Sequence, residues 1–143
     1  WGIGSNYRIS DLLSSIGLSQ LEILDEKKYK LKKIYQKYRD YLKNQSFCQE
    51  VFVDLKNNEF PLYAEYLFDK RDELVDYLDS FGIDTRPFYQ DLDTAKYICA
   101  SEDRIYKDSV FSKKGLTLPG GDALTDSDQK NIIESIFKFY KKK

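Results

Sequence analysis

A stripe of leucine and tyrosine side chains between residues 24 and 43 constrains the fold of this chain more than any other feature. Its members recur at spacings of seven, four, three and four residues: Leu24, Leu31, Tyr35, Tyr38 and Leu42. Such spacings align side chains along one side of an α-helix. Lysines occupy the remaining positions, so we predict a long, half-exposed helix over residues 25–43 whose tyrosines belong to the core. A nucleic-acid or membrane-binding face is the weaker interpretation of this helix.

The segment before this helix is apolar over a wider surface. Ser10 has the character of a helix N-cap and Asp11 that of a first-turn residue. The apolar residues that follow are too widely distributed for an exposed helix: Leu12, Leu13, Ile16, Leu18, Leu21 and Leu24. We therefore expect residues 1–24 to form a junction that is buried against something large. The chain begins with Trp1 rather than Met, and we expect it to be a piece of a longer protein.

Strand and helix patterns alternate in the rest of the chain. Gly82 is placed to end a helix over residues 70–81. Pro87 is placed to stop the strand over residues 83–86. The predicted strands cover residues 51–53, 62–68, 83–86 and 115–119. The predicted helices cover residues 70–81, 101–111 and the stretch from Thr125 to the terminal lysines. This order predicts an α+β fold, in which a short sheet has helices packed on one face.

Length, composition and charge narrow the class of protein. The chain has 143 residues, which suits one domain, and its 41% hydrophobic residues favour a folded chain. The 23 basic and 24 acidic residues nearly cancel, which removes the simplest electrostatic case for nucleic-acid binding. No apolar run approaches the ~20 residues that cross a bilayer, and we expect a soluble, cytoplasmic protein.

The chain contains no histidine. Ser-His and Cys-His nucleophile pairs and histidine-ligated metal sites are therefore excluded within this chain. The two cysteines, Cys48 and Cys99, form no CxxC pair, so we expect reduced, partly buried thiols and no metal site.

Three segments, in order along the chain, carry a family resemblance. Residues 4–25 read GSNYRISDL and continue through IGLSQLE to LD. Residues 82–89 read GIDTRPFY, and Leu118-Pro119 is followed by Leu124-Thr125. Together these resemble the DegT/DnrJ/EryC1/StrS family of sugar aminotransferases, in its perosamine-synthase-like form. The resemblance spans the chain but only about the last two-fifths of a typical member.

The resemblance implies a type I, aspartate aminotransferase-like fold that depends on pyridoxal 5′-phosphate. Residues 25–143 would be the small C-terminal domain, and residues 1–24 would pack on the large domain that precedes it. The catalytic lysine lies in that large domain, so we expect no catalytic residue in this chain and no activity from it alone. The family works as a homodimer with its active sites at the subunit interface.

Two residues of the first segment are expected near the cofactor by resemblance. Asn6 matches an asparagine that reaches the cofactor phosphate of the neighbouring subunit, and an amide can donate to phosphate oxygens. Its alternative role is to satisfy backbone groups of a turn. Arg8 matches an arginine that supports anionic groups of the cofactor or substrate, or else forms a salt bridge between subunits.

Four residues of the later segment are expected near the substrate. Arg86, Phe88 and Tyr89 match a segment that approaches the sugar nucleotide, and Arg86 would meet a diphosphate. The alternative for Arg86 is a strand-end arginine whose stem packs on aromatic rings. Asp93 departs from the family, because many members carry a histidine there. An acid at this position would change the substrate contacts and leaves the sugar undetermined.

The expected reaction of the parent protein is transfer of an amino group from glutamate to a nucleotide-linked keto sugar of the 4-keto-6-deoxy type, in polysaccharide synthesis. Two alternatives stay open. The chain would be a stand-alone binding module that covers the apolar surface of residues 12–21 with a partner. Otherwise it would belong to a degenerate, non-catalytic member of the family.

Overall fold

The computed structural model describes residues 8–57, 59, 61–89, 109–121 and 123–141. In this part of the chain a four-stranded antiparallel sheet has the order β1-β2-β4-β3. The strands are β1 (Cys48–Glu50), β2 (Ala64–Phe68), β3 (Arg86–Pro87) and β4 (Gly115–Leu118). The helices are α1 (Asp11–Glu22), α2 (Leu24–Leu42), α3 (Arg71–Asp79), α4 (Val110–Lys114) and α5 (Asp126–Lys141), with a short 3₁₀ turn η1 (Leu55–Asn57). The α+β fold predicted from the sequence is confirmed.

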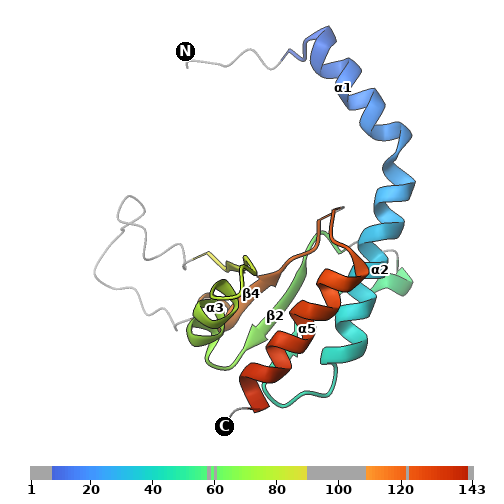
Figure 1. The fold of residues 1–143 in the computed structure, drawn as a ribbon. Coiled ribbons are helices and arrows are strands. Elements are labelled where there is room, and N and C mark those ends of the chain that lie inside the picture. The colour runs from blue at the N-terminus through green and yellow to red at the C-terminus, as the bar shows by residue number, and fades with distance from the viewer. Residues whose placement is uncertain (1–7, 58, 60, 90–108, 122, 142–143) are drawn as a thin grey trace, which may run out of the picture.

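The core lies between one face of the sheet and three helices. Alternate residues of a strand point to opposite faces, and the buried members of β2 that face the core are Ala64, Tyr66 and Phe68. They form one cluster with Leu116 and Leu118 of β4 and with buried side chains of α2, α3 and α5. Figure 1 shows these three helices beside the sheet. The opposite face of β2 and β4 takes no part in this cluster.

Helix α2 confirms the C-terminal part of the predicted stripe, whereas Leu24 at its start is 37% exposed. Tyr35, Tyr38 and Leu42 are each at most 1% exposed, and the Tyr38 hydroxyl donates to the carbonyl oxygen of Pro119 at 2.9 Å. The stripe attaches α2 to α5 as well as to the sheet. Burial raises the pKa of the Tyr38 hydroxyl above its usual range, as expected for a phenol removed from water.

Two predicted helix starts are confirmed by their capping contacts. The Ser10 Oγ accepts a hydrogen bond from the Leu13 amide at 3.3 Å at the start of α1. The Thr125 Oγ1 accepts from the Asp128 amide at 3.1 Å at the start of α5.

Helix α3 ends earlier than predicted, at Asp79 with Ser80 as its C-cap rather than Gly82. Gly82 lies in the turn that follows, with φ of 70°, a left-handed conformation that glycine adopts without a steric penalty.

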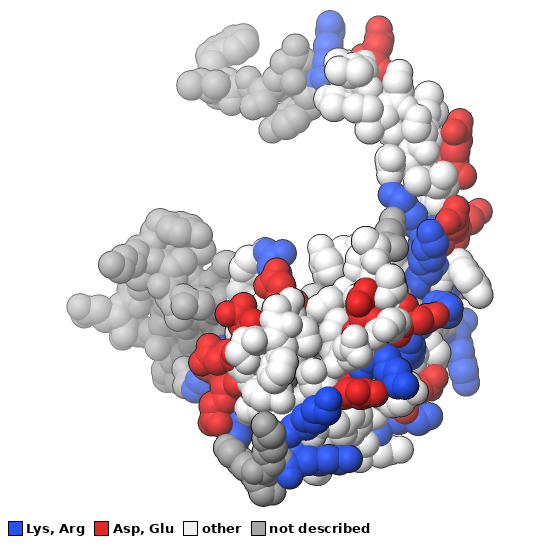
Figure 2. Space-filling model, viewed as in Figure 1, with Lys and Arg blue, Asp and Glu red and all other residues white. Residues whose placement is uncertain are grey.

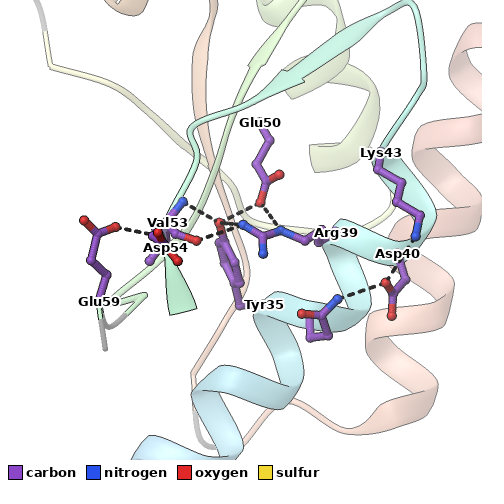
Figure 3. Close-up of polar contacts among 9 residues, drawn as sticks. Tyr35, Arg39, Asp40, Lys43, Glu50, Val53, Asp54 and Glu59 are labelled. Atoms are coloured by element: carbon purple, nitrogen blue, oxygen red, sulfur yellow. Dashed lines mark hydrogen bonds and ion pairs between the residues drawn. The ribbon is translucent and has the colours of Figure 1, made fainter. Parts of the chain in front are cut away.

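The first strand was predicted in the wrong place. The prediction was residues 51–53, because Val51, Phe52 and Val53 favour extended structure, whereas β1 covers Cys48–Glu50. The reason lies in long-range contacts of Val53. Its amide donates to the Tyr35 hydroxyl at 3.0 Å, and its carbonyl accepts from Arg39 at 2.9 Å. Side chains of α2 thus take the backbone groups that a sheet ladder would have used (Figure 3).

Strand β3 is shorter and later than predicted. It covers Arg86–Pro87 rather than residues 83–86, so Pro87 lies inside the strand instead of stopping it. Proline is tolerated there because β3 is an edge strand and needs no second ladder of amide donors. The helix predicted over 101–111 lies largely outside the described residues; α4 begins at Val110, with Ser109 as its cap.

Helix α1 projects from the rest of the structure beyond the start of α2 (Figure 1). None of its residues is buried, and Leu12 is 72% exposed and Leu21 63% exposed. Figure 2 shows few charged side chains on this helix, whereas they are more frequent over α2 and the helices that lie in front of the sheet in this view. No α-helix in the described part of the chain is long and apolar enough to cross a membrane.

Candidate functional site

A pocket lies against the sheet face that the core helices do not cover. Its volume is about 350 Å³, and it is lined by residues of β3 and the segment after it together with Tyr63, Glu65, Phe111 and Thr117. Thr117 of β4 pairs with Glu65 on one side and with Arg86 on the other. Directly paired residues point to the same face of a sheet, which brings Glu65, Thr117 and Arg86 together in the pocket.

Arg86 and Tyr89, both predicted to contact substrate, meet each other in this pocket. The Arg86 guanidinium donates to the Tyr89 hydroxyl and lies 4.8 Å from the centroid of the Tyr89 ring. Tyr89 is 79% exposed, so both groups are accessible from solvent. The group over this ring is the guanidinium and not the aliphatic stem that the alternative interpretation of Arg86 invokes, and an exposed guanidinium is able to meet an anion.

Phe88 forms a wall of the pocket. Its ring lies parallel to that of Phe111, with an interplanar angle of 2° and 6.4 Å between centroids. A Cβ atom at Gly115 would overlap the Phe88 ring and the carbonyl oxygen of Phe111. The absence of a side chain at Gly115 therefore allows the Phe88 ring to approach β4 closely.

Glu65 was missed by sequence reasoning. It is the only charged residue of β2, and its carboxylate makes no hydrogen bond or ion pair with any residue in the described ranges. Burial raises the pKa of this carboxyl above its usual value. An acid within the aromatic segment 62–68 was the available signal, but its position opposite Thr117 depends on strand register.

The remaining predicted residues lie elsewhere. Arg8 is exposed and precedes α1, at the end of that helix farthest from the sheet (Figure 1). The structure therefore does not bring Arg8 together with Arg86. Arg8 is the one described residue predicted to bind the cofactor, and an exposed guanidinium before a helix N-terminus suits a phosphate. Asn6 and Asp93 lie outside the described residues.

Cys48 is a partly buried free thiol, as predicted. Burial, with a smaller contribution from the charge of Asp69, raises its pKa to about 12. A thiol held protonated in this way is a poor nucleophile, so Cys48 is structural. Cys99 lies outside the described residues.

The antiparallel sheet and its three core helices have the fold of solved sugar aminotransferases. The structure of PseC from Helicobacter pylori, an aminotransferase involved in the biosynthesis of pseudaminic acid, superposes with a TM-score of 0.83. It is 18% identical, and the match covers 100% of this chain and 40% of PseC. This likeness defines the fold as that of the corresponding part of a sugar aminotransferase.

The chain belongs to the DegT/DnrJ/EryC1/StrS aminotransferase family, whose profile matches residues 2–137. It is 26% identical to EpsN of Bacillus subtilis, a candidate pyridoxal phosphate-dependent aminotransferase by name, over 96% of this chain and 38% of EpsN. It is 27% identical to the GDP-perosamine synthase of Caulobacter vibrioides, over 94% of this chain and 38% of that enzyme. The predicted family and its perosamine-synthase-like character are confirmed, and the family's aminotransferases depend on pyridoxal phosphate. The chain spans about two-fifths of the length of these relatives.

Proposed function

We propose that this chain is the C-terminal part of a pyridoxal phosphate-dependent aminotransferase that aminates a nucleotide-linked keto sugar, with glutamate as the amino donor. The observation that supports this most is the family match over residues 2–137. The GDP-perosamine synthase among its relatives acts, by its name, on a nucleotide sugar. We place the reaction in the cytoplasm, in polysaccharide synthesis.

The pocket beside β3 is the proposed substrate site of this chain. The Arg86 guanidinium, which is exposed there, binds an anionic phosphate of the substrate. Phe88 and Tyr89 provide aromatic surface for the apolar faces of the sugar. Asp93 is assigned to the same site by resemblance alone.

The cofactor is held mainly outside this chain in our proposal. Pyridoxal phosphate, when bound, supplies the electron sink for amino transfer. Asn6 donates a hydrogen bond to the cofactor phosphate of the neighbouring subunit in a homodimer, and Arg8 supports anionic groups of the cofactor or substrate. The chain itself contributes no catalytic lysine, so it is inactive alone.

Helix α1 is the surface that joins this chain to the rest of the enzyme. We propose that residues 1–24 pack on a preceding large domain and that residues 25–143 form the small domain. The apolar side chains of α1 are exposed on all sides of the helix, and a helix of this kind is stable when it is covered. The same exposure favours one alternative, a stand-alone module that binds a partner through α1.

Amino transfer by the complete gene product tests the proposal. The protein is incubated with pyridoxal phosphate, glutamate and a nucleotide-linked 4-keto-6-deoxy sugar, and the amino sugar is detected by mass spectrometry. The expected result is product from the complete protein and none from residues 1–143 alone. Absence of product with every keto sugar nucleotide tried, from protein that binds the cofactor, would favour the degenerate member or the binding module.

A further inference from the structure

The open face of the sheet carries a carboxylate, a hydroxyl and a guanidinium in one row. Glu65 on β2 pairs with Thr117 on β4, and Thr117 pairs with Arg86 on β3. Neighbouring strands lie about 4.8 Å apart, so Glu65 and Arg86 are separated by about 10 Å across the pocket. The row therefore presents a negative group and a positive group at opposite sides of one cavity, with a hydroxyl between them.

The two charged groups of the row do not neutralise each other. Arg86 contacts the hydroxyl and ring of Tyr89, whereas the Glu65 carboxylate makes no hydrogen bond or ion pair with the described residues. A partly buried carboxylate that lacks donors loses hydration without compensation. Its raised pKa reflects that cost. A ligand that brings hydrogen-bond donors to Glu65 would offset this loss of hydration.

The surroundings of the row restrict the kind of ligand. Tyr63, Phe88 and Phe111 line the pocket with aromatic rings, which suit the apolar C–H face of a sugar ring. Its volume of about 350 Å³ is at the lower end of the range for small-molecule sites. Arg86 suits a phosphate, and a carboxylate that accepts several hydrogen bonds suits vicinal hydroxyls. A sugar phosphate combines all of these features.

We propose that Glu65 is a specificity-determining residue, which accepts hydrogen bonds from hydroxyls of a sugar whose phosphate is bound by Arg86. This inference rests on the proposed function, since it assumes that the pocket takes the sugar of a nucleotide-linked substrate. It adds a selection rule to that function. A sugar with a carboxylate in place of a hydroxymethyl group brings a second negative charge beside Glu65 and is rejected, because like charges at close range disfavour a complex.

Two ligands that differ only at this group test the rule. Glucose 1-phosphate and glucuronic acid 1-phosphate share the ring and the phosphate, and neither depends on the identity of the nucleoside. Their dissociation constants are measured by calorimetry with the full-length protein. We expect the wild type to prefer glucose 1-phosphate by roughly tenfold, a difference that one unfavourable charge contact can produce.

Three variants separate the role of Glu65 from general effects of charge. Glu65→Gln keeps the size of the side chain and removes its charge, so we expect the preference to fall to about twofold or less. Glu134→Gln removes the same charge from exposed α5 and is expected to retain the wild-type preference. Arg86→Gln is expected to weaken both ligands equally, because the phosphate contact is common to them. Circular dichroism of each variant checks the fold.

Either of two results overturns the inference. One is a Glu65→Gln variant that keeps the full wild-type preference; the other is a wild type that binds neither sugar phosphate better than inorganic phosphate. Amino transfer to a keto sugar nucleotide is assayed separately on the same preparations. Transfer without a Glu65 effect leaves the proposed function standing and removes only the selection rule, whereas a Glu65 effect without transfer supports the rule and contradicts the aminotransferase.

Discussion

The side chain of Gln129 on α5 donates a hydrogen bond from its Nε2 atom to the carbonyl oxygen of Ile34 on α2, at 2.7 Å. Gln129 is 2% exposed and is the only buried polar residue among those described. The contact joins the first long helix of the core to the last helix of the chain. It makes the relative position of α2 and α5 depend on one buried amide as well as on apolar packing.

Replacing Gln129 by methionine is expected to destabilise the fold. Gln129→Met keeps the volume of the side chain but removes its donor, so the free energy of unfolding should fall by about 1 kcal/mol. Urea denaturation measures it. Gln36→Met is the matched control, because the Gln36 amide contacts Asp40 on the exposed side of α2 and its loss should change little. Equal stability of Gln129→Met and the wild type would show that packing alone joins the two helices.

The ion pair between Arg39 and Glu50 is expected to contribute more than a surface pair. The Arg39 Nε lies 2.7 Å from Glu50 Oε1, with side chains 18% and 19% exposed, and the Tyr35 hydroxyl donates to the same oxygen at 2.6 Å (Figure 3). Glu50→Ala leaves a largely buried guanidinium without its acid and should cost about 3 kcal/mol in urea denaturation.

The matched control for this pair is Asp40→Ala. Asp40 and Lys43 form an ion pair of 3.7 Å with both side chains more than half exposed, and such pairs contribute less than about 1 kcal/mol. A Glu50→Ala variant no less stable than Asp40→Ala would contradict the importance of burial for the Arg39 pair.

Glu65 is expected to reduce stability at neutral pH. Its pKa is raised in the folded state by burial, so the folded protein binds this proton more tightly than the unfolded chain does. The stabilisation linked to the proton is present below the unfolded pKa, near about 4.3, and is lost as the pH rises through the folded pKa. Glu65→Gln should therefore melt higher than the wild type at pH 7.

The difference in melting temperature between Glu65→Gln and the wild type should shrink as the pH falls towards 4, because the wild-type carboxyl is then protonated and resembles the amide. Thermal melts at both pH values measure it. A Glu65→Gln variant that melts lower than the wild type at pH 7 would mean that the carboxylate has a stabilising partner in the protein. It would contradict the view that this carboxylate lacks hydrogen-bond donors until a ligand binds.

Gly115→Ala is expected to disturb the pocket wall. A Cβ atom at this position would overlap the Phe88 ring and the backbone of Phe111, and overpacking of this kind costs about 1–3 kcal/mol. Calorimetry should also show weaker binding of glucose 1-phosphate. Gly121→Ala is the control, since a Cβ at Gly121 would meet no atom within 4 Å. Undiminished stability and binding in Gly115→Ala would show that Phe88 does not need its present position.

Removing α1 is expected to leave the core intact. No residue of α1 is buried, so residues 24–143 should melt within a few degrees of the 143-residue chain. The longer chain should self-associate more in sedimentation, because its exposed apolar surface is larger. Replacing Leu12 and Ile16 by glutamate should reduce association without changing the melting temperature. Loss of cooperative melting in residues 24–143 would mean that α1 belongs to the core.

The helices were predictable because their signals are local. Tyr35, Tyr38 and Leu42 follow one another at spacings of about one turn, and the Ser10 and Thr125 caps contact amides three residues away. The sheet was harder to predict, since β1 depends on contacts of Val53 with α2 that no short window contains. In the site, Arg86, Phe88 and Tyr89 were found through a contiguous segment. Glu65 was not, because its neighbours Thr117 and Arg86 are brought to it by strand pairing alone.

The row of Glu65, Thr117 and Arg86 also has a consequence for biogenesis. Its central strand, β4, comes last along the chain, so the earlier members of the row have no common scaffold while they leave the ribosome. Pairing between distant segments is slow compared with helix formation. The pocket is therefore among the last parts of the sheet to mature, and a nascent chain that stalls before residue 115 carries its helix α3 but not the pocket.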